Sequence, residues 1–316
     1  MEYAIAAKDV VKTFRGAAAP ALRNFNLSVP SGTLCGLVGP DGSGKTTALR
    51  ILATVTNSFS GSAFVAGYDV RTDPESVRSR IGYMPQNFSL YPDLSIWENL
   101  TFFTELNGVS HERRSERMAS MLEFTGLAPF RERRAGDLSG GMKKKLALAC
   151  ALVHDPRILL LDEPSTGVDP VSRRELWRIL ADVVRRGVTV LISTPYMDEA
   201  ERCHRIGMLY QGRVLLWGTP EELIGGMPSR FLEVKASPRK AMRQIVMRTP
   251  GILSWRPVGD RLRVETAENH SELERIRESL AEQFRAENME VEILQEVKPM
   301  MEDLFVHTVG VQERAS

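Results

Sequence analysis

An eight-residue segment, GPDGSGKT at positions 39–46, limits the folds open to this chain more than any other feature. It matches the spacing G-x-x-x-x-G-K-[ST], in which backbone N–H groups and a lysine hold the phosphates of a nucleotide. The motif carries this meaning only between a buried strand and a helix. We expect that strand at Leu34–Val38 and that helix at Thr47–Thr54. The segment therefore predicts an α/β protein with a phosphate-binding loop.

Each part of this loop has an expected task. A triphosphate must be held by preorganised donors, and the N–H groups from Gly42 to Thr46 would supply them at a helix N-terminus. Lys45 is expected to reach the β- and γ-phosphates, and the Thr46 hydroxyl to bind Mg²⁺. Asp41 adds a carboxylate that we expect to point away from the phosphates. The residues assigned to the nucleotide are Gly39, Pro40, Asp41, Gly42, Ser43, Gly44, Lys45, Thr46 and Thr47.

Two further segments complete the pattern. The aliphatic run Ile158–Leu161 is expected to form a buried strand that ends in the carboxylates Asp162 and Glu163. Open α/β sheets place their ligands at the carboxyl ends of strands. Between this strand and the loop lies the pentapeptide LSGGM, at positions 138–142. In this order the three segments resemble the nucleotide-binding subunit of an ABC transporter, over roughly the first 220 residues.

The resemblance implies roles for the acidic strand end and for one glutamine. Asp162 is expected to orient Mg²⁺, together with Thr46 and Gln86. Glu163 is expected to polarise the water that attacks ATP, and a general base of this kind contributes roughly 10²–10⁴ in rate. The catalytic residues implied are therefore Glu163, Lys45 and Gln86, and the cofactors are ATP and Mg²⁺.

The resemblance also implies a second cassette. In the family, the loop that contains Ser139, Gly140 and Gly141 begins a helix whose N-terminus points at the γ-phosphate held by the opposing subunit. Residues 165–169 fit the D-loop of the same interface. One chain would then supply two half-sites, and it would need a second copy or a homologue to make a whole one.

Two further assignments concern adenine and the membrane partner. Phe14 is a candidate for the aromatic ring that stacks on adenine, although it could equally be a core residue at a strand end. Residues 88–100 are expected to form the groove that receives a cytoplasmic helix of the membrane subunit. The apolar residues expected to line that groove are Leu90, Tyr91, Leu94, Ile96 and Trp97.

One position departs from the family pattern. A histidine normally follows Ser-Thr and contacts the γ-phosphate, but here Pro195 follows Ser193 and Thr194. Proline has no hydrogen bond to donate, and the loss of one preorganised donor to a developing charge costs on the order of 10²–10³ in rate. His204 lies nine residues further on, and a surface or packing role is expected for it. We infer that this chain binds ATP but hydrolyses it slowly at its own loop.

Three readings of the function remain open at this stage. The segments at 168–170 and 196–200, together with the small C-terminal module, resemble most those of ABC-2-type exporters. Such exporters move drugs, lipids or polysaccharides outwards, and their partners are ABC-2-type permease subunits. A regulatory cassette that clamps ATP beside an active homologue is the alternative, and Pro195 is its motive. A soluble ABC ATPase that acts on ribosomes or DNA fits less well, because only about 50 residues separate Gln86 from Leu138, too few for the long coiled coil of the DNA-repair class.

Strands that alternate with helices predict an α/β core with a largely parallel sheet. We expect an ABC cassette at residues 1–225, with a RecA-like core sheet, an antiparallel β subdomain and a helical subdomain at about 87–153. In the accessory domain at 226–316, the order β-α-β-β-α-β over about 70 residues predicts a small ferredoxin-like module. Its role stays open between a regulatory surface and a plain stabilising appendage. Among the elements expected are a strand at Ser62–Val70 and helices at Lys143–Val153 and Met300–Val306.

The composition of the chain bears on which partners and which cellular compartment we expect. A net charge of +1 gives no general electrostatic reason to bind nucleic acid. Cys35, Cys150 and Cys203 lack metal or disulfide spacing, so we expect buried free thiols in a reducing compartment. The N-terminus shows no signal-peptide pattern, and the apolar runs fall short of the ~20 residues that span a bilayer. We therefore expect a cytoplasmic protein that lies on the inner face of the membrane through its permease.

Overall fold

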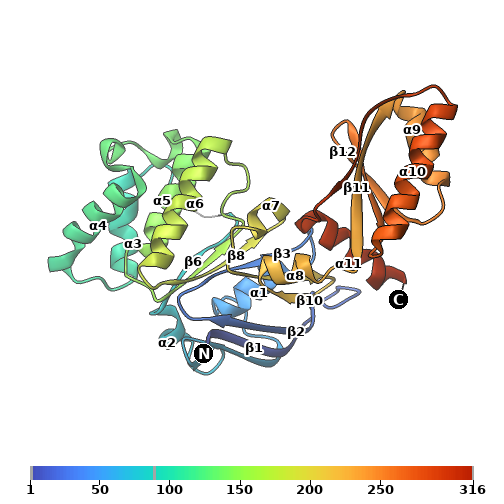
Figure 1. Cartoon of the computed structure of the whole chain (residues 1–316). Coiled ribbons are helices and arrows are strands. Elements are labelled where there is room, and N and C mark those ends of the chain that lie inside the picture. Colours follow the sequence, from blue (N-terminus) through green and yellow to red (C-terminus); the bar gives the residue numbers. More distant parts are fainter. Residues whose placement is uncertain (1–2, 88–89, 315–316) are drawn as a thin grey trace. The chain divides into compact units, whose positions relative to one another are not determined.

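The computed structural model describes residues 3–87 and 90–314. The chain forms two compact units, Met1–Pro220 and Glu221–Ser316. Each unit has its own sheets and helices (Figure 1), and each is described by itself. In the described residues, no helix has both the length and the apolar character needed to cross a membrane.

A six-stranded sheet forms the centre of the first unit. Every neighbouring pair for which the register is given is parallel, except the edge pair of β10 and β9. Strands β3, β7 and β8 are buried along their whole length, which is typical of parallel sheets with both faces covered. In sheet order, the strands are β10 (Arg213–Gly218), β9 (Arg205–Tyr210), β3 (Leu34–Val38), β8 (Thr189–Thr194), β7 (Ile158–Asp162) and β6 (Ile81–Met84).

A second sheet of the first unit is antiparallel, in the order β2 (Leu22–Pro30), β1 (Tyr3–Lys12), β4 (Ser60–Val65) and β5 (Tyr68–Asp69). The single strand expected at Ser62–Val70 is wrong, because a tight turn interrupts it at Ala66 and Gly67. Both turn residues have positive φ, 52° and 83°, which is the geometry of a two-residue hairpin loop. The core between this sheet and the central one includes Phe25, Leu49 and Leu37.

Helices surround and extend the central sheet. Three of them, α3, α4 and α5, belong to the chain segment that connects β6 to β7, and they pack on one another (Figure 1). Helix α3 begins with a capping box, in which Ser95 and Glu98 bond each other's backbone N–H groups. The helices are α1 (Lys45–Leu52), α2 (Pro74–Arg78), α3 (Ile96–Leu106), α4 (His111–Thr125), α5 (Gly140–Leu152), α6 (Pro170–Arg185) and α7 (Met197–Ala200), with short 3-10 turns at Ala128–Phe130 and Ala135–Asp137.

The second unit confirms the ferredoxin-like expectation. Its four strands form an antiparallel sheet in the order β12, β13, β11, β14, and α9 and α10 pack on one another beside it. Their apolar side chains form a separate core with Leu232, Ile245 and Phe284. Along the chain, the elements are α8 (Pro220–Gly225), β11 (Ser229–Ser237), α9 (Arg239–Arg248), β12 (Ile252–Val258), β13 (Arg261–Ala267), α10 (His270–Ala286), β14 (Glu290–Val297) and α11 (Met301–Arg314).

Three helices differ in their bounds from the sequence prediction. Helix α1 spans Lys45–Leu52 instead of Thr47–Thr54. Helix α5 begins at Gly140, three residues before the expected Lys143, because the Ser139 side chain caps it by accepting a hydrogen bond from the Met142 amide. Helix α11 continues to Arg314 instead of ending at Val306. Residues 307–313 are half-buried or exposed, so an apolar face marks the last turns of this helix only weakly.

Candidate functional site

The loop at positions 39–46 joins β3 to α1, as the motif requires. Glycine is needed where the loop passes close to other backbone. A Cβ atom at Gly39 would lie 2.1 Å from the Leu209 carbonyl oxygen, and one at Gly44 would lie 2.5 Å from that of Ala21. Gly44 also has φ +111°, and Gly42 has φ +78°, which favours a residue without a side chain. The turn of this loop therefore depends on the glycines of the motif.

Lys45 begins α1 and turns back over the loop. Its Nζ atom donates to the carbonyl oxygens of Gly39, at 2.8 Å, and Pro40, at 3.0 Å. It also lies 3.6 Å from Glu163 Oε1. The side chain is only 4% exposed, whereas 92% of the Asp41 side chain is exposed. The structure thus places the lysine over the loop. The Asp41 carboxylate is exposed, yet its Oδ1 atom lies 4.0 Å from Lys45 Nζ, so its orientation away from the phosphates stays a prediction.

A pocket of about 270 Å³ opens over the loop and is lined by Ala21, Asp41, Gly42, Gly44, Lys45, Thr46, Thr47, Gln86 and Glu163. Cation, hydroxyl, amide and carboxylate groups therefore share one cavity. Ser43 lies beneath it, with a buried hydroxyl that has no partner among the described residues. Residues from the loop, from the end of β6 and from the end of β7 meet there, although 122 positions separate Asp41 from Glu163 in the sequence.

Asp162 ends β7 and is fully buried. Its Oδ1 atom accepts hydrogen bonds from Thr46 Oγ1, at 3.1 Å, and from Ser193 Oγ, at 2.5 Å. Its Oδ2 atom is buried and has no partner among the described residues. An unpaired buried carboxylate oxygen is costly, and Mg²⁺ takes carboxylate and hydroxyl oxygens as ligands, often through water. Asp162 and Thr46 therefore fit a magnesium ion.

Glu163 follows Asp162 and is held from several sides. Its backbone N–H donates to Ser193, and its Oε2 atom accepts from Gln86 Nε2, at 2.9 Å, and from Thr166 Oγ1, at 3.2 Å. Its φ angle of 49° is in the left-handed region, which costs a non-glycine residue about 1–3 kcal/mol and persists only where the surroundings enforce it. The fold thus holds the carboxylate of Glu163 beside Gln86 and above Lys45.

Ser193 is a site residue that motif reasoning missed. Its hydroxyl donates to Asp162, and its hydroxyl and carbonyl oxygens both accept from the Glu163 amide. Strands β7 and β8 are neighbours, and Asp162 lies opposite Ser193 in their register. A serine at the carboxyl end of a predicted neighbouring strand was the signal available in the sequence.

The LSGGM residues lie apart from this pocket. Gly141 allows α5 to pass close to α6, because a Cβ atom there would lie 2.3 Å from Ser172 Oγ. Gly140 lies near the Gly167 carbonyl oxygen, 3.4 Å from where its Cβ would be. The lining of the 270 Å³ pocket includes neither glycine, nor the capping Ser139. Their assignment to the nucleotide of a second cassette stays a prediction.

Phe14 lies just beyond β1, and its ring is 43% exposed. Lys12 Nζ lies 4.9 Å from the ring centroid. Such exposure argues against a core role, which was the alternative for this residue. The stacking of adenine on Phe14 stays a prediction.

The loop after β8 carries Pro195 beside the phosphate-binding loop. The Thr194 carbonyl oxygen accepts a hydrogen bond from the Gly39 amide, at 3.3 Å. The Thr194 hydroxyl is already used, because it bonds to the buried Glu199, at 2.5 Å. His204 cannot replace a histidine at 195, since its Nδ1 atom accepts from the Leu34 amide, at 3.1 Å. The segment therefore touches the loop but lacks the imidazole of the family pattern.

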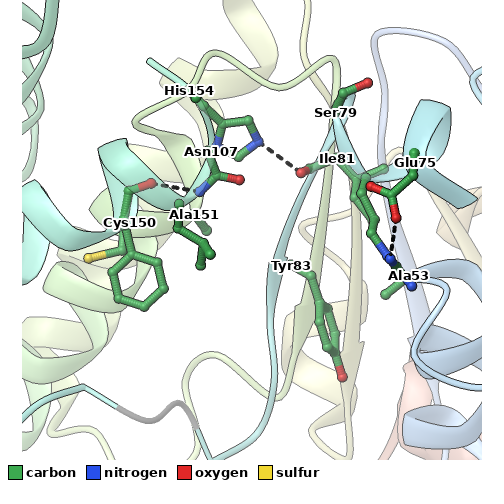
Figure 2. Close-up of a pocket in the computed structure, with 13 residues that line it drawn as sticks. Ala53, Glu75, Ser79, Ile81, Tyr83, Asn107, Cys150, Ala151 and His154 are labelled. Carbon is green, nitrogen blue, oxygen red and sulfur yellow. Dashed lines mark hydrogen bonds and ion pairs between the residues drawn. The ribbon is translucent and has the colours of Figure 1, made fainter. Parts of the chain in front are cut away.

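A larger cavity of about 700 Å³ lies between α2, α3, α5 and β6. Figure 2 shows His154 and Tyr83 among its lining residues, with His154 bonded to the Ile81 carbonyl oxygen. Burial raises the pKa of Tyr83 to about 12, with a further increase from the charge of Asp162. The tyrosine is therefore neutral near pH 7.

This cavity differs from the groove that the sequence predicts. Its lining from α3 comes from the C-terminal end of the helix, at Phe103 and Leu106, rather than from the five apolar residues at 90–97. Ile96 is fully buried, and Trp97 is covered by the Arg131 guanidinium at 4.7 Å. Phe88 and Ser89, which begin the predicted groove, lie outside the described residues.

The phosphate-binding loop and the carboxylates Asp162 and Glu163 at the end of a parallel strand define a P-loop protein that binds a nucleotide. Comparison with known proteins narrows this class. A family model described as "ABC transporter" matches residues 22–166. The chain belongs to the ABC transporter family of ATP-binding proteins, whose cassettes are ATPases.

Curated relatives and solved structures support this assignment. The chain is 45% identical over 237 residues to the probable multidrug ABC transporter ATP-binding protein YbhF of Escherichia coli, across 75% of this chain but 41% of that protein. It is 39% identical over 233 residues to the daunorubicin/doxorubicin resistance ATP-binding protein DrrA of Streptomyces peucetius, across 73% and 70% of the two chains. The cassette MJ0796, solved as a dimer with ADP and phosphate, superposes with a TM-score of 0.63 at 28% identity, over 68% of this chain and 98% of that one.

Proposed function

We propose that this chain is the ATP-binding and ATP-hydrolysing subunit that powers an ABC-2-type membrane exporter. The observation that carries the proposal is the cluster around the phosphate-binding loop. In it, Lys45, Gln86 and Glu163 line one pocket, and Asp162 presents an unpaired oxygen beside Thr46. The names of the relatives, which refer to multidrug transport, drug resistance and Nod factor export, support the export half of the proposal.

The chemistry follows from the positions of the chain's own groups. Loop N–H groups and Lys45 hold the triphosphate, and Mg²⁺ beside Thr46 and Asp162 neutralises charge on the β- and γ-phosphates when bound. Glu163 accepts a hydrogen bond from the attacking water and draws its proton away from the oxygen that attacks the γ-phosphorus. Gln86, bonded to Glu163, keeps that carboxylate turned toward the pocket.

Coupling to transport requires partners. A second cassette, identical or homologous, would close over the nucleotide with its own Ser139, Gly140 and Gly141 or their equivalents. Permease subunits of the ABC-2 type would hold the pair at the inner face of the cell membrane and respond to closure and reopening. Nothing in this proposal needs nucleic acid, and the cargo would be selected by the permease.

A single substitution tests the enzymatic half. Phosphate release from Mg²⁺-ATP is measured for the purified full chain and for Glu163→Gln, and nucleotide binding is measured in parallel with a fluorescent ATP analogue. We expect Glu163→Gln to lower the rate by roughly 10²–10⁴ while ATP still binds. Unchanged hydrolysis in this variant would overturn the assignment of Glu163. For the export half, purification of the complex from membranes should recover a permease of the ABC-2 type.

One observation favours a second candidate, a regulatory cassette that clamps ATP while a homologous partner hydrolyses it. Pro195 cannot donate to the γ-phosphate, and the hydroxyl of the neighbouring Thr194 is bonded to Glu199. In that case the chain alone would bind ATP without turnover, and activity would appear only with the partner cassette. Hydrolysis at ordinary rates by the chain alone, with loss in Glu163→Gln, would exclude the clamp.

A further inference from the structure

Helix α5 touches the nucleotide site through a residue that the motifs do not include. The Lys144 ammonium donates to two main-chain carbonyl oxygens, those of Gln86, at 3.2 Å, and of Glu163, at 3.4 Å. Burial lowers the pKa of Lys144, while the charges of Glu163 and Asp162 oppose that change. The ammonium therefore lies partly buried against the backbone of Gln86 and Glu163.

The two carbonyl groups belong to residues that already act as a pair. The Gln86 side chain donates to Glu163 Oε2 at 2.9 Å, so Lys144 fixes the backbone beneath both members of that hydrogen bond. Glu163 also has the left-handed φ of 49°, a conformation that depends on its surroundings. A donor on the Glu163 carbonyl oxygen restrains the peptide that follows this angle, and hence the direction of the carboxylate.

The same helix begins at the LSGGM segment. Ser139 caps it, and Gly140 lies one turn before Lys144, on the same face of the helix. Because a short α-helix moves as a rigid body, a displacement of its N-terminus also displaces the ammonium one turn away. A contact at LSGGM would therefore reach the Gln86 and Glu163 carbonyl groups through a single side chain.

We propose that Lys144 is a positioning residue that links the LSGGM end of α5 to the Glu163–Gln86 pair of its own chain. When a second cassette places its nucleotide against LSGGM, the position of α5 sets the angle of the Glu163 carboxylate in the first. The two half-sites of one chain are then coupled, and hydrolysis waits for closure. This inference rests on the proposed ATPase function.

The test compares three variants of the full chain. Lys144→Met removes both hydrogen bonds and keeps the length of the side chain, and Lys144→Arg keeps a donor at the same place. Lys143→Met is the matched control on the same helix, since Lys143 is exposed and donates to the Gly136 carbonyl oxygen outside the pocket. Each variant is assayed for kcat, KM for ATP, and thermal unfolding.

We expect Lys144→Met to lower kcat by about 10–100-fold, as is typical when a group that orients a catalytic residue is removed. KM and the affinity for a fluorescent ATP analogue should stay unchanged, Lys144→Arg should restore most of the rate, and Lys143→Met should resemble the wild type. A role in stability alone would lower the unfolding temperature without this separation of kcat from KM. An unchanged kcat in Lys144→Met would overturn the proposal.

A second measurement keeps the proposal testable if the wild type fails to hydrolyse ATP, an outcome that would contradict the proposed function alone. Hydrogen exchange is followed at the peptide segments around Gln86 and residues 163–166, with and without Mg²⁺-ATP. Lys144→Met should speed exchange in both segments, and Lys143→Met in neither. Identical exchange in the two variants would show that Lys144 does not position these segments.

Discussion

Both units bury carboxylates, and those of the nucleotide site are paired differently from those of the second unit. In the first unit, Asp162 Oδ2 has no partner, and the neighbouring hydroxyls of Ser43 and Ser165 are also unpaired among the described residues. In the second unit, Asp303 accepts from Arg263 and Arg256, at distances of 2.7–2.8 Å, and from the Met300 amide. The cluster around Asp162 therefore contains polar atoms without a hydrogen-bond partner among the described residues, whereas Asp303 is fully paired.

Glu265, like Asp303, has a hydrogen-bond partner for each of its carboxylate oxygens. Its two carboxylate oxygens are bonded to Ser229, Ser254 and His307, at 2.8, 2.5 and 2.6 Å. Among the described residues of the second unit, no buried side-chain nitrogen or oxygen lacks a partner. Asp303 and His307 belong to α11, and their partners Arg256, Arg263 and Glu265 belong to β12 and β13.

This difference distinguishes a ligand-binding site from a structural cluster that connects two elements. We call the second cluster, which consists of Asp303, Glu265 and their partners, the joint. Buried polar groups that lack partners are uncommon in native proteins and call for an explanation, such as an ion or a ligand. Groups that are fully paired with each other hold two elements together, here α11 and the sheet. The buried carboxylates of the second unit are therefore paired within its own fold, whereas Asp162 of the first unit keeps one oxygen without a partner among the described residues. The predictions below test this contrast, from the largest effect to the smallest.

Removal of one buried charge should damage the joint most. In Asp303→Asn, Arg263 remains buried without an anion, and breaking a buried pair in this way costs about 3–5 kcal/mol. Urea unfolding of the full chain, with amide exchange to locate the change, should show loss of stability confined to the second unit. ATP binding should persist.

The matched controls for that variant are an exposed pair and a double substitution. Asp182→Asn removes the partner of Arg185 on the surface of α6 and should change stability by less than about 1 kcal/mol. Replacement of both Arg263 and Asp303 by apolar residues should recover much of the loss. If Asp303→Asn is as mild as Asp182→Asn, the cluster does not hold α11.

Addition of a donor should strengthen the site. Pro195→His restores an imidazole next to Thr194, which contacts the phosphate-binding loop through the Gly39 amide. A donor to a developing charge is worth on the order of 10²–10³ in rate, or roughly 2.7–4 kcal/mol. We therefore expect a gain in kcat up to this size in an assembled pair of cassettes, measured as phosphate release.

Pro195→Ala serves as the control for backbone freedom, because it removes the proline ring without adding a donor. A rise in Pro195→His that is absent in Pro195→Ala assigns the gain to the imidazole. Equal rates in both variants and the wild type would mean that position 195 does not limit hydrolysis, and they would remove the motive for the clamp.

Removal of the negative charge of Asp162 should have a smaller effect on the nucleotide site than the Pro195→His substitution. Asp162→Asn keeps the shape of the side chain and its acceptor for Thr46 and Ser193, but removes the negative charge. Groups that orient a bound metal typically contribute about 10–100-fold. The affinity for ATP with Mg²⁺ should fall by this factor, while the affinity with EDTA should stay unchanged. An equal loss under both conditions would mean that Asp162 supports the loop rather than the cation.

Features that lie within one contiguous segment could be predicted from the sequence, whereas contacts between distant segments could be predicted less well. The loop at 39–46, the strand before it and the acidic end of β7 were predictable because motif and hydrophobic run are contiguous. Ser193 and Lys144 were not, since their contacts depend on the register of β7 with β8 and on the packing of α5 against the site. The turn at Ala66 was missed because alanine seldom adopts positive φ.

The fully paired cluster should also respond to acid. Burial raises the pKa of Glu265, but hydrogen bonds from Ser254, Ser229 and His307 outweigh it, and the net pKa is lowered. The stabilisation is therefore complete above the unfolded pKa of about 4.3, and it is lost as pH falls through the lower folded value. We expect amide exchange in α11 to quicken below about pH 4. In Glu265→Gln, α11 should exchange faster near pH 7 and show a weaker response to acid. The opposite result would be unchanged exchange in α11 of the wild type over this pH range, together with a change in ATP binding by the first unit. That result would mean that the carboxylates of the nucleotide site, and not Glu265, are the groups that respond to acid.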